Sequence, residues 1–67
     1  IEQLDEARLK LDAVAWSEDP KRRIAVINGH IMREGQSIDG FVIDRIGAEE
    51  VVVREGGLLW RLVFRIH

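Results

Sequence analysis

The chain has 67 residues, no cysteine and a formal net charge of −2, and it is 46% hydrophobic and 33% charged. This length and composition are typical of one soluble globular domain with a small core, and they exclude disulfides, zinc–thiolate sites and a disordered chain. The only basic run is residues 21–23, so the sequence lacks the broad positive surface of a nucleic-acid-binding protein.

The N-terminal segment, residues 1–8, spaces Ile1, Leu4 and Ala7 at helical intervals. It fits a short helical turn or a frayed terminus, and we take it as a segment that precedes a domain spanning residues 9–67. From residue 9 the period changes to two, which predicts a half-buried strand. One face of this strand would carry Leu9, Leu11, Ala13 and Ala15, and the other Lys10, Asp12, Val14 and Trp16.

The centre of the chain is punctuated by turns. Residues 17–20 include a proline and are expected to form a turn, followed by strands at 23–27 and 30–33. Asn28-Gly29 between those strands predicts a type I′ hairpin, because both residues accept a positive φ. Gly35 is expected to end the third strand in the loop 34–37.

Three further strands are predicted in the second half, at residues 41–46, 51–54 and 58–66. Gly40 would permit a bulge or a close backbone approach before the first of them, and Gly56-Gly57 would form a tight hairpin before the last. In the last strand Leu58, Trp60, Leu62, Phe64 and Ile66 would share one face. The pattern predicts an all-β domain: a small antiparallel sandwich or partly open barrel of five or six short strands.

The sequence presents no recognisable catalytic, metal or cofactor site. His30 and His67 lack the additional ligands of a metal site and the oriented partner that a general base needs. Ser17 and Ser37 lie in expected turns, where hydroxyls bond the backbone. The arginines at 33, 45, 54, 61 and 65 alternate with apolar residues, as on a solvated sheet face where they pair with carboxylates.

A binding role is suggested by the first predicted strand. A small open sheet leaves edge strands with unpaired N–H and C=O groups that a partner strand can extend. This strand is a candidate edge because its neighbour in sequence begins only after the proline-containing turn, although internal pairing is equally possible. Trp16 fits either core packing or a partner contact. The candidate partner-binding residues are Leu11, Asp12, Ala13, Val14, Ala15 and Trp16.

The ordered pattern AWSEDPKRR, AVING, REG and GF, followed by VVVREGG and LLWRLVF, resembles the C-terminal periplasmic domain of the type II secretion system protein B family. The resemblance begins at about residue 9. It implies a domain related to the homology region of protein C and to the pilus lipoprotein PilP. Asn28, Gly29, Gly35 and Gly40 fall on the pattern as structural turn residues, and the family supplies no catalytic residue.

The resemblance further implies a non-enzymatic scaffold in the bacterial periplasm, which docks to the secretin or assists its assembly in the outer membrane. Its implied partners are the secretin's periplasmic domains, the ATPase protein A and, in some systems, peptidoglycan. The family member is anchored in the inner membrane. Since this chain begins at Ile1 without a signal peptide, we expect it to be a fragment whose anchor lies outside it.

The alternative is a small nucleic-acid-binding β-barrel of Sm-like or oligonucleotide-binding type. It predicts a basic stripe with exposed aromatic residues that stack on bases. The balanced charge and the four aromatic residues of the chain argue against it, so we expect no nucleic acid among the partners.

Overall fold

The computed structural model describes residues 1–5 and 7–63, and it confirms an all-β domain. No helix in these residues is long and apolar enough to cross a membrane. One short 3-10 helix, Pro20–Arg22, interrupts the strands. The strands are β1 (Glu2–Gln3), β2 (Leu11–Ala15), β3 (Ile24–Ile27), β4 (His30–Met32), β5 (Ser37–Ile38), β6 (Phe41–Ile46), β7 (Glu50–Glu55) and β8 (Leu58–Val63).

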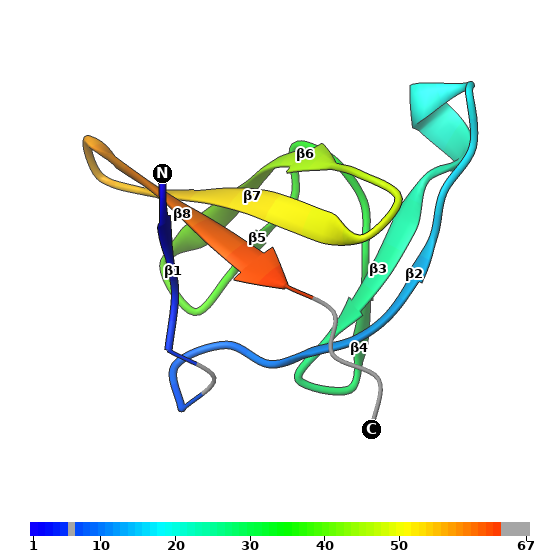
Figure 1. The fold of residues 1–67 in the computed structure, drawn as a ribbon. Helices are drawn as coiled ribbons and strands as arrows, with labels where there is room; N and C mark the ends of the chain where they lie inside the picture. The colour runs from blue at the N-terminus through cyan, green and yellow to red at the C-terminus, as the bar shows by residue number, and fades with distance from the viewer. Residues whose placement is uncertain (6, 64–67) are drawn as a thin grey trace.

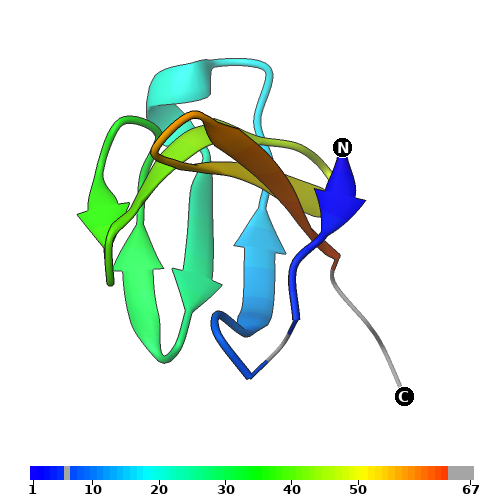
Figure 2. The ribbon, with the colours of Figure 1, turned by 90° about the vertical axis from the view of Figure 1, so that its left-hand side faces the viewer.

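The strands form two sheets that pack face to face without closing into a barrel (Figure 1). The larger sheet has the order β1-β8-β7-β6-β5, and the smaller has the order β2-β3-β4. Figure 2 shows the three strands of the smaller sheet side by side. The buried core lies between the sheets and comprises Leu4, Leu9, Leu11, Ala25, Ile27, Met32, Phe41, Ile43, Ile46, Val51, Val53 and Leu62.

Two hairpins are set by residues with positive φ. Asn28 (φ 52°) and Gly29 (φ 80°) join β3 to β4, which confirms the predicted type I′ turn. Asp39 (φ 50°) and Gly40 (φ 85°) join β5 to β6 in the same way. The expectation that Gly40 permits a bulge or a close approach is therefore wrong, because Gly40 supplies the second left-handed residue of a hairpin. Because the two-residue turn at Asp39-Gly40 pairs Ser37 with Val42, Ser37 lies in β5 and not in the predicted loop 34–37.

The start of the N-terminal segment, Glu2–Gln3, is a strand, whereas its end forms a single turn in which the Asp5 carbonyl accepts from the Arg8 N–H at 3.0 Å and the Leu9 N–H at 3.4 Å. Glu2 and Gln3 pair in parallel with Trp60 and Arg61 of β8, and the Leu4 N–H donates to the Arg61 carbonyl at 2.8 Å. Leu4 is only 3% exposed and belongs to the core. The helical spacing of the apolar residues was misleading for Glu2 and Gln3, because the edge of β8 supplies hydrogen-bond partners for their backbone. The boundary between residues 8 and 9 stays a prediction.

The strand count exceeds the predicted five or six because β1 and β5 are only two residues long and carry no period-two pattern. The strands predicted at 23–27, 30–33, 41–46 and 51–54 are found to within one residue at either end. Predicted strand 58–66 is confirmed as far as Val63, and its last three residues lie outside the described part.

The assigned face of β8 is confirmed for Leu58, Trp60 and Leu62, because β8 pairs with β7 without a register shift. Trp60 packs against the core and Leu62 is buried, whereas Leu58, which directly follows the Gly56-Gly57 turn, is 60% exposed on the same face. Phe64 and Ile66, predicted to share this face, lie outside the described residues.

Candidate partner-binding edge

Strand β2 lies at an edge of the three-stranded sheet, as its sequence suggested. Among the described residues it is hydrogen-bonded to one strand, β3, by antiparallel pairing. In the part of the chain that the structure describes, the edge strands of the two sheets are β1, β2, β4 and β5, and β2 is the longest of them at five residues. A long edge offers the most backbone groups to an incoming strand.

A bulge in β2 changes which side chains face the core. Leu11 is opposite Ile27, but the register shifts before Ala13, which is opposite Val26. The predicted alternation therefore fails after Leu11. Val14 packs against the core, whereas Ala13 and Ala15 are exposed, the reverse of the sequence prediction. The extra residue at the bulge moves every following side chain to the other face.

The pairing also fixes where the backbone of Val14 points. In a two-residue hairpin the flanking pair, here Ile27 and His30, exchanges both hydrogen bonds, and bonded pairs then alternate along the strands. The backbone N–H and C=O of Ala25 are therefore directed toward β4. Val14 lies opposite Ala25, so these two residues form a pair that is not hydrogen-bonded between β2 and β3. The N–H and C=O of Val14 are directed to the open side of β2.

Asn28 and Asp12 hold the N-terminal end of this edge in register. The Asn28 Oδ1 accepts from the Lys10 N–H at 2.8 Å, and the Asn28 N–H donates to the Lys10 carbonyl at 3.0 Å. The Gly29 N–H donates to Asp12 Oδ2 at 3.1 Å. The β3–β4 turn is therefore bonded to β2 as well as joining its own strands.

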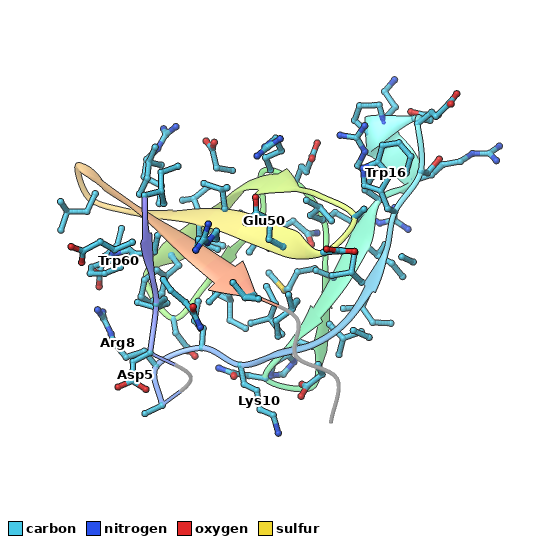
Figure 3. The ribbon with its side chains drawn as sticks, viewed as in Figure 1. Asp5, Arg8, Lys10, Trp16, Glu50 and Trp60 are labelled. Carbon is cyan, nitrogen blue, oxygen red and sulfur yellow. The ribbon has the colours of Figure 1, made fainter. Side chains whose placement is uncertain are left out.

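Trp16 lies at the opposite end of the edge from Lys10, beside the 3-10 helix (Figure 3). Its side chain is 48% exposed, and the Arg23 guanidinium carbon lies 5.0 Å from the centre of its ring. This contact is a cation–π interaction. Of the two readings that the sequence left open for Trp16, the structure contradicts core packing and leaves a surface position from which a partner can be contacted.

Arg23 organises the loop around Trp16. Its Nε donates to the Ser17 carbonyl at 2.6 Å, and one of its terminal nitrogens lies 3.6 Å from Glu34 Oε2. Glu34 in turn accepts from the backbone N–H of Ile46 at 2.9 Å. These bonds connect the end of β2, the loop after β4 and the end of β6, and so hold the Trp16 ring against a fixed support. Sequence analysis missed this role of Arg23, which requires contacts between distant segments.

The 17–20 turn follows the sequence prediction. Ser17 Oγ accepts from the Asp19 N–H at 3.2 Å, and Asp19 caps the 3-10 helix by accepting from the Lys21 N–H at 3.0 Å. Pro20 occupies the first position of that helix, where no N–H is needed.

The predicted structural turn residues divide into hairpin and loop positions. Asn28, Gly29 and Gly40 form the hairpins described above, and Gly35 has φ 88° in the loop between β4 and β5. The Gly35 N–H donates to the Ile43 carbonyl at 2.8 Å, which ties this loop to β6.

Beside His30 the structure presents an open hollow rather than an enclosed pocket. His30 lies at the start of β4 on a shallow hollow that also reaches Gln36 and Ser37, and His67 lies outside the described residues. In residues 1–5 and 7–63 no three histidine, aspartate or glutamate side chains are grouped to hold a metal ion.

Comparison with known proteins gives one match. A family model described as type II secretion system protein B matches residues 8–63, which is most of the chain and includes β2 through β8. No curated protein and no solved structure matches.

Proposed function

The chain belongs to the type II secretion system protein B family, and from that premise we propose that this domain is a non-enzymatic periplasmic scaffold that docks to the secretin or assists its assembly in the outer membrane. Family membership itself makes the chain a component of type II protein secretion in the bacterial envelope. The proposal adds the compartment, the partner and the docking surface.

The proposed docking surface is the β2 edge, residues Leu11–Trp16. The observation that supports it most directly is the outward N–H and C=O of Val14 on the longest sheet edge of the described residues. A partner strand that pairs there would add main-chain hydrogen bonds, while neighbouring side chains would provide specificity. Trp16, exposed and supported by Arg23, would provide an aromatic anchor at the end of the added strand.

The wider set of partners rests on the resemblance of the sequence. We include the ATPase protein A and, in some systems, peptidoglycan, with an inner-membrane anchor supplied by a segment outside this chain. Strand addition requires a rigid platform, and the bonds between Asn28 and Lys10 provide one at the N-terminal end of the β2 edge.

The test is an NMR titration of the isotope-labelled domain with the cognate secretin's periplasmic domains. We expect chemical-shift changes concentrated on residues 11–16. Val14→Pro removes the outward N–H at a position where an edge strand tolerates proline, and it should abolish those changes without unfolding the domain. Trp16→Ala should weaken binding while preserving the spectrum of the core.

The control is Ala15→Gly, which alters the same strand but retains every backbone N–H. Titration of the wild-type domain to high concentration without shift changes on β2 would contradict the proposal. Equal binding by the wild-type and Val14→Pro domains would contradict the strand-addition mode.

A further inference from the structure

The outer face of the three-stranded sheet is apolar at every position that the pairing directs outward. In register across the sheet, Ala13 of β2 lies opposite Val26 of β3, and Val26 lies opposite Ile31 of β4. Ala15 and Ile24 form the next pair. Ala13 and Ala15 are exposed, Ile24 and Val26 are half-buried, and Ile31 is 66% exposed. We call these five residues the apolar face.

The outer face of the five-stranded sheet is built differently. Its central residue, Val52, is only 5% exposed and lies in register with Arg45 and Arg61 on the flanking strands. Both arginines are within 4.0 Å of Glu50 carboxylate oxygens. Ion-paired arginines thus flank Val52 on this sheet, which confirms the predicted role of these two residues. Farther along the same face, Val42 and Leu59 are exposed on either side of Arg54.

The apolar face is continuous with the free edge of β2. Ala13 and Ala15 belong to the edge strand itself, and Val14 between them directs its backbone N–H and C=O away from β3, toward the unpaired edge of the sheet. A strand added there would place alternate side chains beside the two alanines on the same face. Because alanine is small, the added strand can carry larger side chains, which would extend over Ile24 and Val26.

We propose that the partner at this edge is an extended segment with apolar side chains at alternate positions, which pairs with β2 by its backbone and covers the adjoining part of the apolar face, on β2 and β3, with those side chains. The inference rests on the proposed function, since it describes the chemistry of the partner at the same edge. A partner with charges on that side would leave them desolvated against apolar groups without counter-charges.

The test compares two variants of the domain for binding to the cognate secretin's periplasmic domains by calorimetry. Val26→Lys places a charge on the apolar face, on the strand next to β2, where the side chains of the partner are proposed to lie. Val42→Lys introduces the same charge at an exposed valine on the outer face of the other sheet. We expect Val26→Lys to weaken binding about ten-fold or more, as for a charge placed in a desolvated apolar contact, and Val42→Lys to bind as the wild type does.

Equal affinities of the two lysine variants would overturn this inference while leaving strand addition intact, because the Val14→Pro result reports on the edge alone. A second arm uses two synthetic peptides of the same composition, one with alternating valine and serine and one with its valines in a single block. Preferential binding of the alternating peptide supports the inference even if the secretin domains do not bind. Equal binding of the two peptides contradicts the inference. Concentration-dependent dimerisation of the free domain that Val26→Lys abolishes also contradicts it, since the occupant would then be a second copy.

Discussion

Asn28 bonds both backbone polar groups of Lys10, accepting from its N–H at 2.8 Å through Oδ1 and donating to its carbonyl at 3.0 Å through its own N–H. The asparagine thereby continues the β2–β3 ladder past the end of β3 while also forming the first residue of the β3–β4 turn. One residue therefore stabilises the turn through its backbone conformation and the candidate edge through its hydrogen bonds.

Substitutions of Asn28 should separate these two roles. Asn28→Gly keeps a residue that accepts positive φ but loses the bond to the Lys10 N–H, and we expect a loss of about 1 kcal/mol in the free energy of unfolding. Asn28→Ala also loses the conformational preference, so it should cost about 1 kcal/mol more. Urea denaturation measures both, and equal stabilities of the two variants would show that the left-handed conformation at residue 28 costs nothing.

The turn glycines provide a matched pair. A Cβ at Gly29 or at Gly57 would meet no atom within 4 Å, but only Gly29 has a left-handed φ, of 80°. We expect Gly29→Ala to destabilise the domain by about 1 kcal/mol through backbone strain alone. Gly57→Ala should be neutral or slightly stabilising, because it restricts the unfolded chain. Thermal denaturation of both variants checks this, and a Gly29→Ala domain as stable as Gly57→Ala would rule out strain at the hairpin.

Glu34 satisfies a backbone N–H of a residue that is fully buried. Its Oε2 accepts from Ile46 N–H at 2.9 Å and lies 3.6 Å from a terminal nitrogen of Arg23. Glu34→Ala removes the acceptor, and we expect a loss of about 2 kcal/mol in the free energy of unfolding. Glu34→Gln retains a carbonyl oxygen in that place and should cost about half as much.

Hydrogen exchange provides the specific readout for Glu34. The amide of Ile46 should lose protection in Glu34→Ala and retain most of it in Glu34→Gln. An unchanged exchange rate at Ile46 in both variants would mean that the bond does not protect that amide.

Trp60 combines core packing with an unsatisfied polar atom. Its ring packs against the core, and among the described residues its Nε1 is a buried side-chain atom without a hydrogen-bond partner. We expect Trp60→Ala to cost about 3 kcal/mol, the lower end of the range for a large aromatic residue, because the side chain is only partly buried. Trp60→Phe keeps an aromatic ring and removes the unpaired N–H, so its cost should be below about 1.5 kcal/mol.

Chemical denaturation followed through Trp16 fluorescence in both variants measures these differences, since Trp16 then remains as the single tryptophan. A Trp60→Phe domain as unstable as Trp60→Ala would show that the indole nitrogen has a partner in solution.

The amino-acid sequence by itself determined the features that depend on a few neighbouring residues. Asn28-Gly29 specified a hairpin because both residues accept a positive φ, and Phe41–Ile46 was placed at its observed bounds because a glycine lies on each side of it. The all-β class followed from the same local signals. The family resemblance, carried by an ordered set of short motifs, was also readable from the sequence and is confirmed over residues 8–63.

Only the tertiary structure decided the features that depend on distant contacts. Glu2–Gln3 is a strand because the edge of β8 lies beside it, and no periodicity in two residues could indicate this. The bulge after Leu11 reversed the faces of Ala13, Val14 and Ala15, because one additional residue in a ladder shifts all that follow by half a period. The apolar face exists for the same reason: the side on which a residue falls is set by pairing across the sheet, which the order of residues in one strand does not contain.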